Sequence, residues 1–173
     1  MKGVSALVAV IFCLPGFSCG YHTNARAVQL PSNVHTIAIP AFVNQSGTYR
    51  IEQILTGAVV REFVTRTNYH VDNKPDEGSD AILRGTVLAT SAVPSAYDSQ
   101  TGRAASVQVT VIMKVSLTDR QGKVLFENGS YIFRDQYQVS RELSSFFEED
   151  TPALQRLSQE FARTLVSNIL EGF

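Results

Sequence analysis

Side chains that could do chemistry are few in this chain of 173 residues, and their spacing does not suggest an active site. The three histidines are His22, His35 and His70, and no two have the i, i+4 spacing that places two metal ligands on one helix face. Neither a Gly-x-Ser-x-Gly elbow nor a phosphate-binding glycine loop occurs. The acids of residues 148–150 are more simply explained as partners for the positive end of a helix that follows them. We therefore expect no catalytic residue, no metal site and no cofactor.

The two cysteines are more informative, because both lie near the N-terminus. Cys13 and Cys19 leave the rest of the chain without a disulfide or a thiolate metal site. Lys2 gives a short positive start, and the apolar run from Val4 to Leu14 is about 11 residues, too short to cross a bilayer, which needs about 20. Small and helix-breaking residues follow it. This pattern predicts a secretory signal peptide over residues 1–18.

Cys19 is the candidate lipid anchor. Ser18 and Cys19 resemble the last two positions of the bacterial lipoprotein signal Leu-x-(Gly/Ala/Ser)-Cys, although Gly16 stands where Leu is usual. Cleavage there would make Cys19 the acylated first residue, and more than one acyl chain would make the anchoring stable. Gly20 follows, in place of the Asp that tends to retain such proteins in the inner membrane. We therefore expect an outer-membrane lipoprotein.

Composition indicates a single ordinary domain behind this anchor. The chain has 15 basic and 16 acidic residues, a formal net charge of -1 and 44% hydrophobic residues. This length can bury one hydrophobic core. A nucleic-acid-binding domain would normally carry a basic excess, so we expect no nucleic-acid partner.

Two helices are predicted from apolar residues that recur at a spacing of three or four. The first has its apolar stripe between Ile51 and Phe63, and Thr48 is its candidate cap. The second begins at Thr151-Pro152, a hydroxyl cap followed by a proline at the first helical position, and runs to Phe173.

Strands are predicted from alternation and β-type composition. The clearest is residues 107–118, where apolar residues at odd positions alternate with mostly polar ones, so one face should be buried. A turn at residues 119–122 leads to a partner strand that we expect to be interrupted near Asn128-Gly129. The other predicted strands are residues 36–39 and 81–91, with a further short candidate at 69–72.

These elements predict an α+β fold in which two helices pack on one face of a four-stranded, mixed but mostly antiparallel sheet, in the order β-α-β-β-β-α. Residues 19–34 are predicted to form a tether and residues 35–173 a single domain. No element remains to cover the second face of the sheet. That face and the two free edges are candidate interaction surfaces.

Two predicted connections of thirteen residues are candidate functional loops. They are residues 92–104, which contain Arg103, and residues 138–150, which contain Arg141. Loops of this length without structure of their own are uncommon and often functional, but each could equally be an ordinary flexible connection.

In the order of its elements, the chain resembles the LptE family of lipopolysaccharide-assembly lipoproteins. The stretches that carry the resemblance are Cys19-Gly20-Tyr21-His22, Leu30-Pro31, Thr36-Ile37-Ala38-Ile39-Pro40, Phe42-Val43-Asn44, Arg61-Glu62-Phe63, Ala81-Ile82-Leu83-Arg84-Gly85 and Ile169-Leu170-Glu171-Gly172-Phe173. Together with the long alternating strand, they span nearly all of the chain after Ser18.

This resemblance implies a lipid-anchored protein that is not an enzyme, on the periplasmic side of the outer membrane. It implies that the domain plugs the β-barrel protein LptD, and that the pair inserts lipopolysaccharide into the outer leaflet. It also implies lipopolysaccharide binding through basic residues near one end of the sheet. Arg103 and Arg141 lie in the corresponding loops, and Lys114 on the polar strand face is a third candidate. An Arg side chain can hold a phosphate through two parallel hydrogen bonds.

A second lipoprotein class remains open at this point. Residues 37–47, followed by an amphipathic helix, also resemble the opening of periplasmic lipoproteins related to CsgG and LpoB, which form secretion pores or activate peptidoglycan synthases. The long final hairpin and the helix that ends at Phe173 favour lipopolysaccharide assembly.

Overall fold

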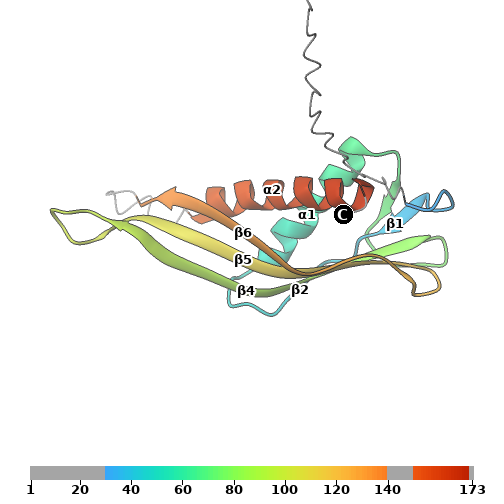
Figure 1. The fold of residues 1–173 in the computed structure, drawn as a ribbon, viewed down its shortest axis with the longest axis horizontal. Coiled ribbons are helices and arrows are strands. Elements are labelled where there is room, and N and C mark those ends of the chain that lie inside the picture. The colour runs from blue at the N-terminus through green and yellow to red at the C-terminus, as the bar shows by residue number, and fades with distance from the viewer. Residues whose placement is uncertain (1–29, 140–149, 172–173) are drawn as a thin grey trace, which may run out of the picture.

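Eight elements make up residues 30–139 and 150–171, the part of the chain that the computed structural model describes (Figure 1). In chain order they are β1 (Thr36–Ala38), β2 (Val43–Asn44), α1 (Ile51–Arg66), β3 (His70–Asp72), β4 (Ala81–Tyr97), β5 (Ala104–Asp119), β6 (Val124–Gln138) and α2 (Asp150–Glu171). Both helices lie on one face of the sheet, as expected (Figure 1). Among the described residues, no helix has the length and hydropathy needed to cross a membrane.

The sheet has six strands, not the four predicted, and the element order differs accordingly. Its order is β3-β1-β4-β5-β6, with β2 pairing β4 beyond the end of β1. The short strands pair in parallel: β1 with β3 and β4, and β2 with β4. The long strands β4, β5 and β6 pair antiparallel. Of the two additional strands, β3 matches the short candidate predicted at residues 69–72, and β2, with two residues, is too short to show a period in the sequence. Pro40 lies in the gap between β1 and β2, where a missing N–H donor is tolerated.

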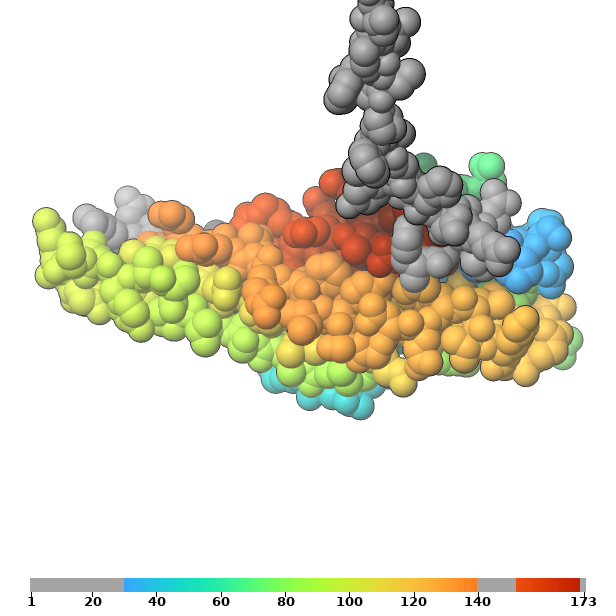
Figure 2. All heavy atoms as spheres, in the orientation of Figure 1, coloured from blue at the N-terminus to red at the C-terminus, as the bar shows by residue number. Residues whose placement is uncertain are grey.

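The predicted loop at residues 92–104 is mostly strand, which corrects the sequence interpretation. β4 continues to Tyr97 and β5 begins at Ala104, so only residues 98–103 connect them. Register shifts near residues 88 and 95 absorb extra residues in β4. Pro94 pairs with Val107 on a stretch of β4 that has no second partner strand among the described residues, the kind of position where proline is found in sheets. We call residues 94–107 the arm, because this end of the β4–β5 hairpin extends past α2 at one end of the molecule (Figures 1 and 2).

The alternation predicted for β5 is confirmed over its central part. Val109, Val111, Met113, Val115 and Leu117 are all buried beneath the helices, and the residues between them are partly or fully exposed. The interruption expected near Asn128-Gly129 is also present, as a register shift opposite residue 114 within one continuous β6. Hydrophobic burial on this one face therefore holds the helices to the sheet.

The two helices run in the same direction and are inclined to each other (Figure 1). Their first halves line one shallow cavity, and near their ends Arg66 Nη1 donates to Ser167 Oγ at 3.0 Å. The expected Thr48 cap is wrong, because α1 starts after Arg50, whose φ of 56° is left-handed. The Thr48 hydroxyl instead lies 2.7 Å from that of Thr90 on β4. α2 begins at Asp150, close to the predicted Thr151.

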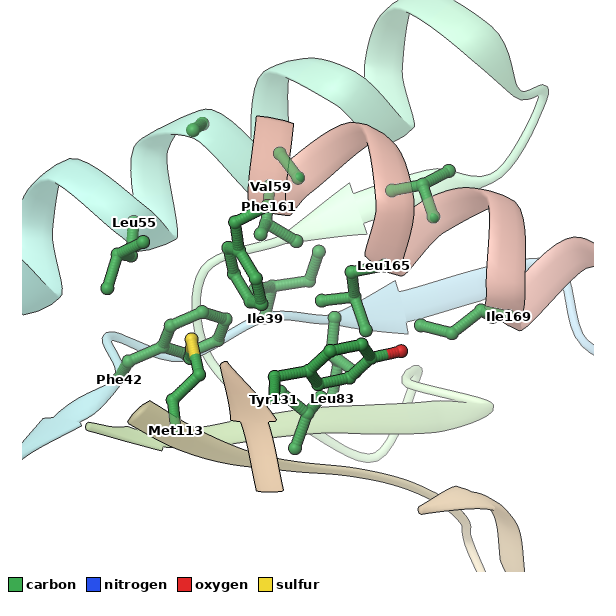
Figure 3. Packing of buried hydrophobic residues seen from close by; sticks show 14 of the residues in the cluster. Ile39, Phe42, Leu55, Val59, Leu83, Met113, Tyr131, Phe161, Leu165 and Ile169 are labelled. Atoms are coloured by element: carbon green, nitrogen blue, oxygen red, sulfur yellow. The ribbon is translucent and has the colours of Figure 1, made fainter. Parts of the chain in front are cut away.

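The core lies between the helices and the sheet, and Phe161 of α2 is at its centre (Figure 3). Its ring meets those of Tyr131 and Phe133 of β6 edge-on, with centroids 6.0 and 5.1 Å away. Leu30 and Val34, which precede β1, are also buried, at 7% and 4% exposure. The folded unit therefore includes residues from the segment that sequence patterns suggested as a tether.

Candidate interaction surfaces

Two of the sequence-derived site residues, Cys19 and Arg141, lie outside the described residues, as do His22 and the pair Glu148-Glu149. Arg103 and Lys114 are described, and the structure does not bring them together. Both lie on or beside β5 and are eleven residues apart, which corresponds to roughly 35 Å along an extended strand. A single headgroup cannot bridge them.

Arg103 lies at the tip of the arm, in a hydrogen-bonded turn. Asp98 Oδ1 accepts hydrogen bonds from the N–H groups of Gln100 and Thr101 at 2.8 and 3.0 Å. The Asp98 N–H donates to the carbonyl of Arg103 at 2.8 Å, and Gly102 adopts a left-handed φ of 67° that closes the turn. The Arg103 side chain is exposed at this end of the molecule. The geometry holds a cation at the arm tip, available to an anionic ligand.

Lys114 lies on the uncovered face of the sheet, near its middle. Its Nζ is 3.2 Å from Glu127 Oε1 of β6, and both side chains are about half exposed. Such an exposed pair contributes little to stability, so it leaves both groups free to exchange partners.

The remaining histidines do not form a site. His35 and His70 are adjacent through the backbone, because the His70 N–H donates to the His35 carbonyl at 2.8 Å. The His70 ring lies 3.4 Å from Asp72 and is largely exposed. In residues 30–139 and 150–171, no group of three metal-ligating side chains occurs, and no buried side-chain nitrogen or oxygen lacks a hydrogen bond.

Two shallow cavities involve the helices of the described structure. One, of about 470 Å³, is lined by residues 44–53 around the start of α1, including Tyr49 and Arg50, whose guanidinium lies 4.8 Å from the Tyr49 ring. The other, of about 410 Å³, lies between the helices beside Gly57, Arg61 and Gln159. Both are open to solvent, and their lining residues include no histidine or cysteine and one acid, Glu52.

Asp80 ties β1 to the end of the sheet opposite the arm. Its Oδ2 accepts hydrogen bonds from the N–H groups of His35 and Thr36 at 2.8 and 3.0 Å, and its Oδ1 is 3.1 Å from Arg120 Nη2. Arg120 also donates to the carbonyls of Ser79 and Gly78 at 2.7 and 2.9 Å. These N–H donors, His35 first, lower the pKa of Asp80, with a smaller contribution from the Arg120 charge.

Asp80→Asn is expected to lower the melting temperature most at neutral pH. The pKa of Asp80 is lower in the folded state than in the unfolded state. The carboxylate therefore stabilises the fold at every pH above its unfolded-state pKa, and this contribution disappears as the pH falls through its folded-state pKa. Thermal melts followed by circular dichroism at about pH 7 and about pH 2.5 measure this. Glu77→Gln in the same loop is the matched control. It should leave the difference in melting temperature between the two pH values the same as in wild type. A destabilisation by Asp80→Asn that is equal at both pH values would contradict the prediction.

The sequence interpretation missed one feature of the uncovered face. That face was expected to be mostly polar, yet Val43, Val93 and Ile132 are exposed on it at 55%, 49% and 46%. The only available signal was the run Tyr131-Ile132-Phe133, in which the alternation of β6 is broken by an apolar residue at an outward position.

Comparison with known structures establishes the fold. Lipoprotein B from Nitrosomonas europaea superposes with a TM-score of 0.53 at 13% identity, over 82% of this chain and 89% of its own. Protein XCC0632 from Xanthomonas campestris gives 0.52 at 12% identity, over 83% and 91%. PelC from Paraburkholderia phytofirmans, a dodecamer, gives 0.50 at 13% identity, over 79% and 88%. At these identities the similarity shows a shared fold and does not by itself select between the two lipoprotein classes.

Comparison with known sequences selects the family. No curated protein matches the sequence. The model of the LptE family, described as lipopolysaccharide assembly, matches residues 34–169. This range includes every strand, all of α1 and all of α2 except its last two residues. This family comprises non-enzymatic lipoproteins of the Gram-negative envelope. Because the match covers well over half of the sequence, the chain belongs to the LptE family of lipopolysaccharide-assembly lipoproteins.

Proposed function

We propose that this chain is the plug of an outer-membrane β-barrel of the LptD type, and that the pair delivers lipopolysaccharide to the outer leaflet. The observation that carries the proposal is the family match over residues 34–169. Most of the surface of a plug must be polar, because the lumen of a barrel is largely polar. Exposed charged residues in the connections of the domain, such as Lys74, Glu77 and Lys123, suit that environment.

Membrane attachment through Cys19 is part of the proposal. Residues 1–18 would be removed as a signal peptide, and acyl chains on Cys19 would hold the domain on the periplasmic side of the outer membrane. The intact mass of the protein extracted from membranes should then exceed that of residues 19–173 by a diacyl or triacyl adduct. An unmodified mass would remove the anchor from the proposal.

Lipopolysaccharide contact is proposed for Arg103 at the arm tip together with Arg141. Lys114 is a separate candidate, since it is paired with Glu127 and distant from Arg103. Each Arg could hold a lipid phosphate through two parallel hydrogen bonds, which Ala cannot replace. In the purified complex, Arg103→Ala with Arg141→Ala should lower bound lipopolysaccharide without lowering the amount of barrel protein. Unchanged lipid binding would exclude these two residues.

Affinity purification of the full-length protein from membranes in mild detergent tests the central proposal. The expected result is a stoichiometric β-barrel of the LptD type, identified by mass spectrometry. Recovery of a peptidoglycan synthase or a secretion pore without the barrel would favour the CsgG and LpoB class instead. Recovery of neither would reject the plug function.

A further inference from the structure

The uncovered face of the sheet carries a definable set of outward side chains, which we call the open face. On β5 these are the residues at even positions, because the odd positions between 109 and 117 are buried under the helices. Strand pairing extends the set to the other strands. The members used below are Val43, Asp72, Arg84, Val93, Ile112, Lys114, Glu127, Ile132 and Arg134. No helix among the described residues covers this face (Figure 1).

The centre of the open face is apolar. Ile112 of β5 lies directly opposite Ile132 of β6, which is 46% exposed. Val93 lies opposite Gln108, and Val43 lies beside Thr86, with about half of each valine exposed. Exposed aliphatic side chains that gather on one face, with polar residues around them, are typical of an interaction surface.

The charges of the open face are unbalanced, although the whole chain is nearly neutral. Strand pairing places three cations on the face, Arg84, Lys114 and Arg134. It places two acids there, Glu127, which is paired with Lys114, and Asp72 on β3, which lies 3.4 Å from the His70 ring. Arg84 makes one hydrogen bond, to Thr118 Oγ1 at 3.4 Å, and no ion pair within residues 30–139 and 150–171 involves Arg84 or Arg134. The face therefore offers two unneutralised guanidinium groups around its apolar centre, which favours an acidic partner.

The shape of the open face favours a protein over a lipid chain. Ligands with acyl or aromatic bodies bind in concave sites. Both cavities described above are lined by residues 44–61 and 155–159, and no residue of β4, β5 or β6 lines either of them. A broad sheet surface with an aliphatic centre and charged rim instead has the composition of a protein interface. Sheets pack face to face at about 10 Å by interdigitating such side chains.

We infer that the open face is the surface by which this protein docks against the wall of its barrel, at a patch whose side chains are apolar at the centre and acidic opposite Arg84 and Arg134. The inference rests on the proposed function, since it takes the barrel as the partner. In this arrangement the sheet, and not the helix layer, makes the tightest contact with the barrel wall. Complementary charges set orientation and exclude wrong partners, while the Ile112 and Ile132 pair supplies the desolvated centre.

The test compares three charge-reversed variants of the full chain in the same purification. Arg84→Glu with Arg134→Glu alters the open face without breaking an internal ion pair. Arg61→Glu with Arg163→Glu makes the same charge change on the exposed surface of the helices, and Lys74→Glu with Lys123→Glu makes it in two exposed connections that belong neither to the open face nor to the helices, so the second pair is the neutral control. The open-face variant should recover at least about tenfold less barrel than wild type, while the neutral control should recover about as much as wild type and the helix variant more than the open-face variant. Circular dichroism melts verify that all three variants are folded.

Each other outcome has a separate meaning. Equal recovery by all three variants, or loss confined to the helix variant, overturns the docking surface and leaves the plug function standing. Retention of the barrel with loss of lipopolysaccharide would identify the open face as a lipid surface and also overturn the inference. If wild type itself recovers no barrel, the proposed function and the docking surface fail together. Ile132→Ser is a second variant that changes no charge, and it should weaken recovery in the same direction.

Discussion

Replacing Phe161 by Ala is expected to lower the free energy of unfolding by about 3–5 kcal/mol, the largest effect of any single substitution considered for this protein. The Phe161 side chain is fully buried, and its ring contacts Tyr131 and Phe133 edge-on. Figure 3 shows it pointing from α2 toward Phe42 and the sheet. Truncation therefore loses buried apolar area and leaves a cavity at the junction of both helices and β6. Urea denaturation of the purified protein measures the change.

Phe161→Leu is the matched control, because it keeps most of the buried volume. It should cost much less than Phe161→Ala, although it loses the aromatic edge contacts, which contribute about 0.5–1.5 kcal/mol. A cost below about 1 kcal/mol for Phe161→Ala would mean that α2 does not hold the core in the way that the structure describes.

Replacing Gly85 by Ala is expected to destabilise the fold by about 1–3 kcal/mol, although the change adds only one methyl group. A Cβ atom at Gly85 would lie 2.8 Å from two ring atoms of Phe42, which is closer than real Cβ atoms approach. Phe42 cannot easily move, because it is 4% exposed and its N–H donates to Thr56 Oγ1 of α1 at 3.0 Å. Thermal or urea denaturation measures the effect.

Gly57→Ala is the control, and it should stabilise the fold where Gly85→Ala destabilises it. Gly57 lies inside α1, and a Cβ atom there would meet no atom of the rest of the protein within 4 Å. The helix should gain about 0.5–1 kcal/mol, because Ala loses less conformational freedom than Gly on forming a helix. If both substitutions change stability in the same direction, the Phe42 contact is not what requires a glycine at position 85.

Elements with a strong local pattern were predicted well. The central part of β5 follows its alternation, because each buried odd residue gains from burial on its own and the period of a strand is two. Both helices were located from apolar stripes for the same reason. The resemblance to the LptE family, which rests on the order of these elements, is confirmed by the family match.

Elements whose pairing depends on distant residues were predicted poorly. Residues 92–97 are rich in Ala, Ser and Pro and suggested a loop, yet they form strand because β5 offers a complete set of backbone partners. β2 is strand only because it meets β4 across some forty residues of sequence. α1 starts at Ile51 without the Thr48 cap, since that hydroxyl contacts Thr90. Long-range backbone pairing overrides local propensity in the first two cases, and a long-range side-chain contact does so in the third.

The candidate interaction residues were also predicted only in part. Basic residues could be identified from the sequence, but their positions in space could not. Only strand register shows that Arg84, Lys114 and Arg134 share one face, while Arg103 lies at the arm tip roughly 35 Å from Lys114. Only the register likewise shows that Ile132 points outward beside Ile112, opposite to the face that holds Tyr131 and Phe133.

The sequence by itself determined the class of this protein: an α+β domain with two amphipathic helices, one long alternating strand and the element order of the LptE family. These follow from periodicity, which is a local property of the chain. The tertiary structure alone decided the number of strands, the length of the arm, the requirement for a glycine beneath Phe42 and the composition of the open face. Each of these depends on which residues distant in sequence become neighbours, and that is set by the cooperative packing of the whole core.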